Sequence, residues 1–368
     1  MFRWLWRLWE RYEQHLRVAA LGTGFIFDLF IADRPDSAYN NLILLSYLVI
    51  AGGSIILLNL RTAKYAEHRP NYQPIFLLLV LQFCFGGLAS NLLVLYGRSG
   101  TLAASTLFFL ILGGMVIGNE FMRSRYAQLR FNIVIYYLLL LTYVLIAAPT
   151  FIFHSIGTLE FLASGFLSLV IIAGFLWLVY VLVLRKHERE AHLYEVSVLV
   201  GLVFVFFNGL YFLGIIPPVP LSLKDVGVYH SLERLEAPAG GSGSIYSARY
   251  EPPAWFVFWR DTSSTFTVTL PTQAHCFSSV FAPAKLSTPI YHVWQRYNEA
   301  EAKWVTTLRT SFPISGGRAE GYRGFTSAQV SPGKWRCNVE TQNGSLIGRI
   351  SFTVEQSPTL PELSQTAL

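Results

Sequence analysis

The sequence is poor in charged residues. Only 14% of its 368 residues are Asp, Glu, Lys or Arg, whereas 53% are hydrophobic; an ordinary soluble domain has about 25% charged residues. The deficit falls in residues 18–216, which are nearly continuous apolar runs, while residues 220–368 have the composition of a soluble domain. The net charge of +6 comes without a long Lys or Arg block, and most basic residues lie in short loops between apolar runs. We therefore predict two regions in different solvents and no nucleic-acid partner.

Patterns that carry common chemistry are also missing. There is no nucleophile elbow, phosphate-binding loop or dinucleotide fingerprint, and no pair of carboxylates stands out in the second region. His187, Glu188 and His192 resemble a zinc motif, but these histidines are five positions apart and do not share a helical face. We expect no enzyme, no catalytic residue, no metal and no cofactor.

Seven apolar stretches are long enough, or nearly so, to cross a bilayer, which takes roughly 20 residues. Thirteen Lys and Arg residues fall in the N-terminal segment and the loops on its side, against two in the alternate loops. Because positive residues stay in the cytoplasm, this predicts a cytoplasmic N-terminus and an external segment from residue 217. The weakest stretch is the first, which is short and carries Asp28. The stretches are 17–32, 40–60, 74–96, 101–119, 131–153, 162–184 and 196–216.

Residues 1–16 precede the seven-helix domain (17–216) and form an amphipathic pattern rich in Trp and Arg. Such a helix is typical of the membrane interface, and the alternative is that it docks on the bundle.

Four polar residues inside the predicted spans are candidates for function, because polar groups are costly in a bilayer. They are Asp28, Gln82, Asn91 and Asn208. The alternative is that the amides join helices by hydrogen bonds, and that Gly86 with Ser90 only allows close packing.

Residues 217–245 begin with a run of prolines and contain a Gly-Ser stretch, so we predict a linker and extension there. Residues 246–368 predict an all-β domain, an immunoglobulin-like sandwich, with a disordered tail from about residue 357. The predicted strands are 245–250, 254–260, 264–270, 275–282, 290–297, 304–312, 321–330, 334–341 and 346–355.

The last two strands flank Asn343-Gly344, which favours a two-residue type I′ hairpin. This fixes a register with one apolar and one polar side. The apolar side has Trp335 opposite Phe352 and Cys337 opposite Ile350, and the polar side has Arg336 opposite Ser351 and Asn338 opposite Arg349.

Three cysteines are present. Cys84 lies in a predicted span, and this position predicts a side chain that only packs between helices. Cys276 and Cys337 both lie in the external domain, where an oxidising compartment permits a disulfide; two unpaired buried thiols are the alternative.

Aromatic and basic residues of the external domain allow two interpretations. The tryptophans, Trp294, Trp304 and Trp335 among them, predict a core more readily than a stacking platform. Arginines including Arg296, Arg309 and Arg336 form either a basic binding face or an ordinary solvated surface.

The last quarter of the chain resembles the bacterial domain of unknown function 2914. Its pattern has a His-x-Trp strand, a Gly-Gly-Arg turn, a Tyr-Arg-x-Phe-Thr strand, a Gly-x-Trp-Arg strand and an Asn-Gly hairpin. The resemblance implies an inner-membrane protein with a periplasmic β-domain, and it brings no activity because the family has none to transfer. The matching positions are His292, Trp294, Gly316, Gly317, Arg318, Tyr322, Arg323, Phe325, Thr326, Gly333, Trp335, Arg336, Asn343, Gly344, Phe352 and Val354.

Three functions are compatible with these observations. The first is a membrane-anchored, non-catalytic periplasmic module that binds an envelope protein, lipid or polysaccharide. The second is a transporter, or an accessory subunit of one, that uses the intramembrane polar residues. The third is a seven-span sensor that signals through a partner. The oligomeric state stays open.

Overall fold

The computed structural model divides into two compact units, a helical one up to Pro220 and an all-β one over Leu221–Leu368. The structure describes residues 19–27, 36–65, 74–99, 110, 114, 125–184, 191–213, 215–216, 220–235, 245–253, 257, 260–269, 272–283, 286–315, 321–359 and 361–368.

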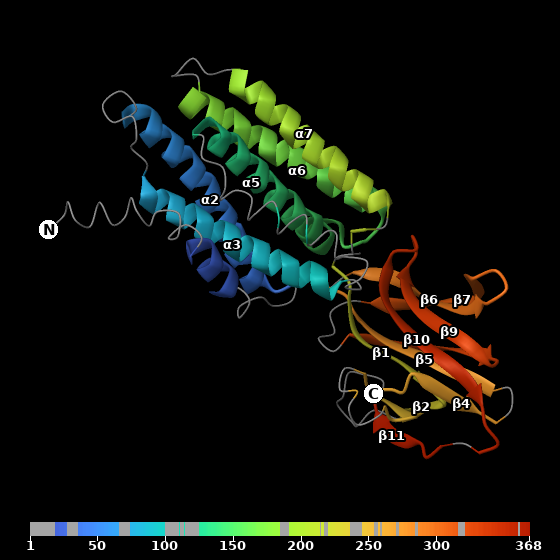
Figure 1. Ribbon diagram of the computed structural model, residues 1–368. Coiled ribbons are helices and arrows are strands. Elements are labelled where there is room, and N and C mark those ends of the chain that lie inside the picture. The colour runs from blue at the N-terminus through green and yellow to red at the C-terminus, as the bar shows by residue number, and fades with distance from the viewer. Residues whose placement is uncertain are drawn as a thin grey trace. The chain divides into compact units, whose positions relative to one another are not determined.

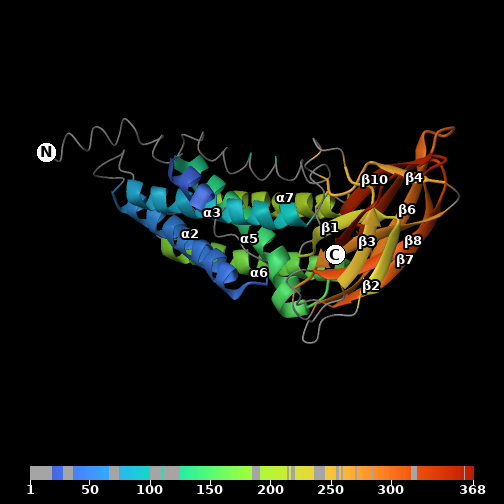
Figure 2. The same cartoon turned by 90° about the horizontal axis from the view of Figure 1, so that it is seen from below.

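In the described part of the first unit, five long helices run side by side (Figures 1 and 2). Short π-helical turns, η2 (Pro149–Phe153) and η3 (Tyr180–Leu184), extend the third and fourth of these helices. The helices are α2 (Ala38–Tyr65), α3 (Ile75–Arg98), α5 (Arg125–Ala148), α6 (Thr158–Val179) and α7 (Ala191–Phe212).

These five helices are long and apolar enough to cross a membrane, and each overlaps one of the predicted spans. Of the other two spans, the first has a helix over residues 19–27, while Asp28 and residues 29–32 lie outside the described residues. The span 101–119 is described only at residues 110 and 114, and the predicted interfacial helix 1–16 is not described.

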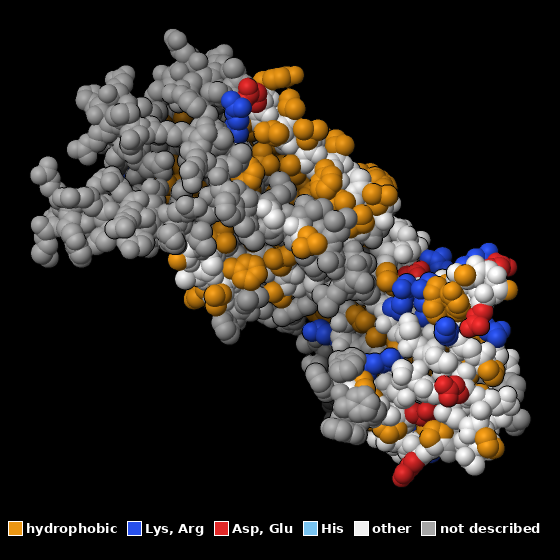
Figure 3. Space-filling model, viewed as in Figure 1, with side chains coloured by type: hydrophobic (Ala, Val, Ile, Leu, Met, Phe, Trp, Pro, Cys, Tyr) orange, Lys and Arg blue, Asp and Glu red, His pale blue; other side chains and the backbone are white. Residues whose placement is uncertain are grey.

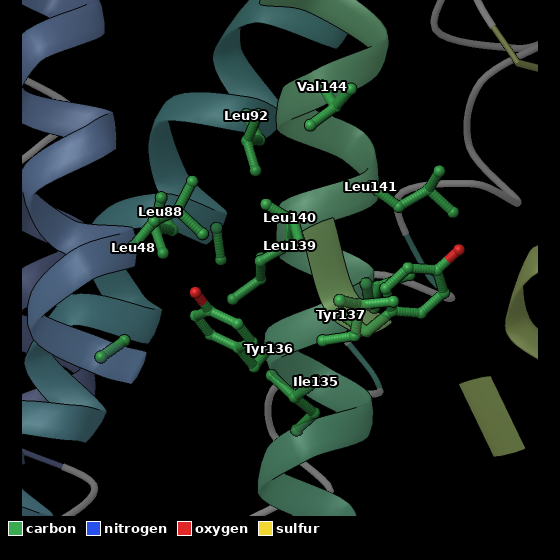
Figure 4. Packing of buried hydrophobic residues seen from close by; sticks show 14 of the residues in the cluster. Leu48, Leu88, Leu92, Ile135, Tyr136, Tyr137, Leu139, Leu140, Leu141 and Val144 are labelled. Atoms are coloured by element: carbon green, nitrogen blue, oxygen red, sulfur yellow. The ribbon is translucent and has the colours of Figure 1, made fainter. Parts of the chain in front are cut away.

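Helix α5 forms the centre of the first unit. In its most apolar stretch 83% of residues are buried, against 22% in α7. Figure 4 shows Tyr136 and Leu139 of α5 in the packing between helices, with Leu48 of α2 and Leu88 of α3 nearby. The peripheral helices expose large apolar side chains, such as Phe166 and Val205, over much of the surface in Figure 3. Soluble proteins rarely expose apolar patches of this extent.

The described strands of the second unit form three sheets. One has the order β1-β5-β8, the second β4-β10-β9-β6-β7 and the third β11-β3-β2. Neighbouring strands are antiparallel except β4 and β10, which are parallel. The strands are β1 (Ser222–Tyr229), β2 (Ser231–Leu235), β3 (Ile245–Tyr250), β4 (Thr265–Val268), β5 (Thr272–Phe281), β6 (Ser287–Asn298), β7 (Lys303–Ser315), β8 (Tyr322–Val330), β9 (Gly333–Thr341), β10 (Leu346–Gln356) and β11 (Ser364–Ala367).

A single apolar core joins the first two sheets. Trp294 of β6 is fully buried there and packs edge-on against Phe352 of β10, with ring centroids 6.4 Å apart. Trp335, Cys276 and Cys337 belong to the same cluster. Alternating inward residues from both sheets thus cover each other, as two-layer β packing requires.

Eight of the nine predicted strands overlap observed ones. The expected strand 254–260 is not a strand at the residues described there, 257 and 260. The predicted linker 217–245 is wrong for β1 and β2. The prolines and the Gly-Ser stretch suggested a linker, but β1 pairs with β5 and its Val228 reaches the core.

The predicted disorder from about residue 357 is also wrong. Residues 364–367 form β11 on the edge of β3, and the backbones of Leu368 and Tyr246 exchange two hydrogen bonds of 2.8 and 3.0 Å. Leu368 also packs beside the buried Tyr246 and Phe277. Backbone pairing therefore orders the segment that was predicted to be disordered.

The register predicted for the last hairpin is confirmed, with Cys337 opposite Ile350 and Arg336 opposite Ser351. The predicted type I′ turn is wrong. Gly344 has a positive φ of 80° and its N–H donates to the carbonyl of Thr341 (3.0 Å), while Asn343 is not among the positive-φ residues. This is a three-residue loop ending in a left-handed glycine. A bulge around Ile347, between Leu346 and Gly348, then restores the predicted pairing.

Candidate functional site

The outward face of the five-stranded sheet carries the most organised set of polar side chains on the second unit. The strand register places Ser351, Arg336, Gln295 and Thr306 in one row across β10, β9, β6 and β7. The next row contains Arg349, Asn338, Val293 and Arg309. We call this surface the arginine face; its members are Tyr291, Gln295, Tyr297, Trp304, Thr306, Arg309, Lys334, Arg336, Asn338, Arg349 and Ser351.

Three cations on this face lie over aromatic rings. The guanidinium of Arg336 is 4.2 Å from the ring centre of Trp304, and that of Arg309 is 4.2 Å from the ring centre of Tyr291. The Lys334 ammonium is 5.4 Å from the ring of Tyr297. Cation–π attraction holds these long side chains close to the sheet. Figure 3 shows Lys and Arg side chains gathered around apolar ones in this region.

Amide side chains fix the two central arginines. Arg336 donates its Nε–H to Oε1 of Gln295 (2.6 Å), and Arg349 donates its Nε–H to Oδ1 of Asn338 (2.6 Å). Asn338 in turn donates to Glu340 (2.9 Å). Each guanidinium is thus held through Nε, and among the described residues no salt bridge joins its terminal nitrogens to a carboxylate. Two pre-oriented cations therefore keep donor groups for a ligand.

The electrostatic environment of these arginines is unfavourable to their charge. Partial burial and the neighbouring Arg349 lower the pKa of Arg336, and burial lowers the pKa of Arg349, while Glu340 opposes both effects. Arginine stays protonated at neutral pH despite such shifts. The pair is therefore a site of positive charge that Glu340 offsets only in part.

Two pockets adjoin the arginine face. One has a volume of about 820 Å³ and is lined by Arg296, Tyr297, Gly333 and Lys334 among others. The other has a volume of about 450 Å³, and its lining includes Arg349 and Ser351 of β10 together with Arg260, Asp225 and Asp261. Burial and the nearby Asp261 raise the pKa of Asp225. One hollow thus adjoins the β10 end of the rows, and the other adjoins the face where β6 ends and β9 begins.

Cys276 and Cys337 lie in the core and not on this face. They form a disulfide between β5 and β9, with Cα atoms 6.6 Å apart. The imidazole of His292 lies close enough that these three residues could be taken for metal ligands. Sulfurs bonded to each other are not thiolates, however, and thiolates are what a metal binds. This cluster therefore fits a cross-link between sheets.

His292 completes a buried polar network beside the disulfide. Its Nε2 and Oγ of Ser278 are 2.8 Å apart, and its Nδ1 and Oγ1 of Thr326 are 2.9 Å apart. Trp294 donates Nε1–H to the same Thr326 hydroxyl (3.0 Å). Burial lowers the pKa of His292 to about 3. The ring is thus a neutral, fully bonded link between β6, β5 and β8.

The structure separates the other candidate motif residues. Trp294 and Trp335 are buried in the core, and Tyr322 and Arg323 lie on β8 in the opposite sheet. Arg318 lies outside the described residues. Arg336 alone among the described motif residues belongs to the arginine face.

The amides of the helical unit have different partners. Asn91 and Asn40 are fully buried and donate to each other, at 2.7 and 3.2 Å, which joins α3 to α2. Asn208 donates to the carbonyl of Phe204 in its own helix (2.8 Å). Gln82 is buried, and its Oε1 has no hydrogen-bond partner among the described residues. Asn91 and Asn208 thus have structural roles.

Several residues of the arginine face escaped the sequence interpretation. Gln295 carries no motif, and Trp304 was expected to be core, whereas the predicted register placed Asn338 on the polar side opposite Arg349. The hairpin register did place Arg336 and Arg349 on the polar side. The partners of Arg336 come from β6 and β7, and the pairing of these strands with the hairpin has no local sequence signal.

Comparisons with known proteins add little about function. No curated protein matches the chain. A beta-glucosidase from Listeria innocua in complex with isofagomine has 10% identity and a TM-score of 0.19, and the match covers 36% of this chain and 22% of that one. The alkylpurine DNA glycosylase AlkC of Pseudomonas fluorescens, bound to DNA with an abasic site analog, has 9% identity and a TM-score of 0.22, and the match covers 88% and 100%. Likeness at this level carries no argument. Residues 287–354, which hold most of the arginine face, match the family model described as protein of unknown function, DUF2914.

Proposed function

We propose that this chain is a membrane-anchored, non-catalytic binding protein of the bacterial cell envelope. The observation that carries the proposal is the arginine face, where neutral amides fix Arg336 and Arg349 and neither forms a salt bridge with a carboxylate among the described residues. Holding two like charges together costs free energy unless an anion binds them. A binding role for the β-unit explains why they are arranged so.

The helical unit serves as the anchor in this proposal. Five helices have the length and apolar composition of spans, and the two stretches 17–32 and 101–119 bring the number to seven. The excess of Lys and Arg in one set of loops supports a cytoplasmic N-terminus and a periplasmic β-unit. The Cys276–Cys337 disulfide agrees with an oxidising compartment.

An immunoglobulin-like sandwich is the architecture that we propose for the β-unit. Two sheets share one core, and a disulfide crosses between them beside a buried tryptophan, as in immunoglobulin domains. The parallel β4–β10 pair and the third sheet are additions to that pattern.

Transport is the second candidate, and Gln82 favours it. Its buried Oε1 lacks a partner among the described residues, and an unsatisfied amide inside a bundle is a candidate for contact with a passing solute. Asn91 and Asn208 do not favour this function, since both bond within the bundle.

Site-specific photo-cross-linking in living cells tests the binding role. The photoreactive residue replaces Ser311, which is exposed on β7 next to the arginine face, or Glu233, which is exposed on β2 in another sheet. We expect an adduct with an envelope component at position 311, lost when Arg336→Gln and Arg349→Gln are combined. Equal adducts at both positions, or none at 311, would contradict the role.

Labelling of single cysteines tests the orientation. A membrane-impermeant maleimide added to intact spheroplasts should label Thr306→Cys in the β-unit and spare Lys186→Cys in a predicted cytoplasmic loop. The opposite labelling would contradict a periplasmic β-unit.

A further inference from the structure

We propose that the ligand of the arginine face is an acidic polysaccharide, bound in extended form with its carboxylates on Arg336 and Arg349. This inference rests on the binding role proposed above and specifies the chemical class of the ligand.

The anionic part of the ligand follows from the two central arginines. Both use Nε–H to bond a neutral amide oxygen, so the terminal amino groups remain for an incoming group. A guanidinium presents these donors as a flat fork that matches a carboxylate. Arg349 lies opposite Asn338, two residues from Arg336, a diagonal relationship of about 7–8 Å between Cα atoms. Two anionic groups at comparable spacing would fit the pair.

The hydroxyl-bearing part of the ligand follows from the residues between the cations. The row through Arg336 otherwise consists of Ser351, Gln295 and Thr306. Gln295 Nε2 donates to the exposed Thr306 hydroxyl (3.0 Å), which leaves hydroxyl and amide groups able to bond a neutral partner. A surface that alternates cations with such groups suits a ligand that alternates carboxylates with hydroxyls, as acidic sugars do.

The shape of the surface favours a chain over a single small anion. A row across four strands, each about 4.8 Å from the next, is about 14 Å long. The 450 Å³ pocket beside Arg349 and Ser351 extends the row at β10, and the 820 Å³ pocket beside Tyr297 and Lys334 widens the surface along the strands. Tyr297 lies against Trp304 with ring centroids 5.2 Å apart, and aromatic rings at such an end offer apolar contact to a sugar ring.

A lipid surface fits these observations less well. Arg336 lies over the ring of Trp304, and Arg349 donates a hydrogen bond to Asn338, so both arginine side chains are held close to the sheet. Basic residues that bind anionic headgroups extend from the surface toward the bilayer. The polar residues between the arginines would also have no role in a purely electrostatic contact.

The experiment measures binding of polygalacturonate oligosaccharides to the full chain in phosphatidylcholine nanodiscs. The matched ligand is the methyl-esterified oligosaccharide, which keeps the hydroxyls and lacks the charge. We expect the acid form to bind at least about tenfold more tightly, because charge-assisted hydrogen bonds are roughly twice as strong as neutral ones. Affinity should fall as salt is raised.

Variants locate the site. Arg336→Gln with Arg349→Gln should weaken binding at least about tenfold, and Arg336→Lys with Arg349→Lys should give an intermediate loss because lysine keeps the charge without the fork. The matched control is Arg234→Gln with Arg249→Gln, which makes the same charge change on the β2–β3 sheet and should leave binding unchanged. An equal loss in both glutamine variants would overturn the assignment to this face.

Two further probes separate this inference from the proposed function. Poly-L-glutamate, or vesicles containing phosphatidylglycerol, could bind through Arg336 and Arg349 as tightly as the oligosaccharide. In that case the assignment of the ligand as a polysaccharide is wrong, and the proposed binding role stands. If no anionic probe binds and position 311 gives no adduct in cells, both proposals fall. Binding of the methyl ester equal to that of the acid also overturns the inference.

Discussion

Cys276 on β5 and Cys337 on β9 are joined by a disulfide that crosses the core between two sheets. The two cysteines are 61 positions apart, so the cross-link removes a large amount of chain entropy from the unfolded state. Replacing both by alanine should lower the free energy of unfolding by about 4 kcal/mol. Chemical unfolding of the purified full chain, followed by tryptophan fluorescence, measures the loss.

Cys84→Ala is the matched control for this prediction. Cys84 is a buried free cysteine in α3, so its removal should leave the β-unit transition in place. Mass spectrometry under non-reducing conditions should detect the 276–337 cross-linked peptide, and alkylation of both cysteines without reductant would refute it.

The buried His292 should make the β-unit less stable in acid. Its pKa is lowered to about 3 by burial, whereas a histidine in the unfolded chain titrates near 6.5. Below about pH 6.5 the unfolded chain therefore binds a proton that the folded chain does not. Stability should fall by up to about 1.4 kcal/mol per pH unit from this residue until the pH approaches 3.

The pH dependence of unfolding in His292→Gln measures this contribution, since the variant lacks the titrating ring. Its stability should change less steeply between pH 6.5 and 4 than that of the parent chain. His275→Gln is the comparison, because His275 is only half-buried and its pKa is lowered by that burial and by His230. Parallel curves for the parent and His292→Gln would exclude the effect.

Replacing Gly86 by alanine should change the thermal stability in a different direction from replacing Gly53 by alanine. A Cβ on Gly86 would overlap the backbone oxygen of Leu21, and one on Gly24 would overlap that of Phe83, so the helix over 19–27 and α3 meet through glycines. A Cβ on Gly53 would have no atom within 4 Å. Gly86→Ala should therefore lower the thermal stability of the detergent-solubilised chain. Gly53→Ala should preserve or raise it, because alanine favours a helix by about 1 kcal/mol. Matching shifts in both variants would contradict close packing at Gly86.

The Asn40–Asn91 pair should behave as a structural link between α2 and α3. Each amide donates to the other, so Asn91→Leu leaves a buried amide without its partner and should cost about 1 kcal/mol. Asn40→Leu combined with Asn91→Leu should cost less than the sum of the two single changes. Thermal unfolding of the four chains gives the coupling, and strict additivity would show that the bonds contribute nothing.

The last hairpin illustrates how far the sequence could lead. Alternating apolar residues fixed the pairing of Cys337 with Ile350, because a shift by one residue would expose every core side chain. The turn type did not follow, since the Ile347 bulge compensates for a different loop and the local sequence does not encode that compensation.

The arginine face was predicted in part. Arg336 and Arg349 were placed toward solvent, but Gln295 and Trp304 come from strands whose pairing depends on the whole sheet.

The parallel pairing of β4 with β10 has a consequence for how the β-unit folds. Thr265 lies beside Thr353, and β11 near the end of the chain completes the sheet begun by β2 and β3. Contacts between such distant segments make folding slow, on the order of milliseconds to seconds, and the core cannot close before residue 354 is available. Cys276 and Cys337 are fully buried once it has closed. An oxidant must therefore reach both thiols while the chain is still open, which in the proposed orientation is the interval between export and folding.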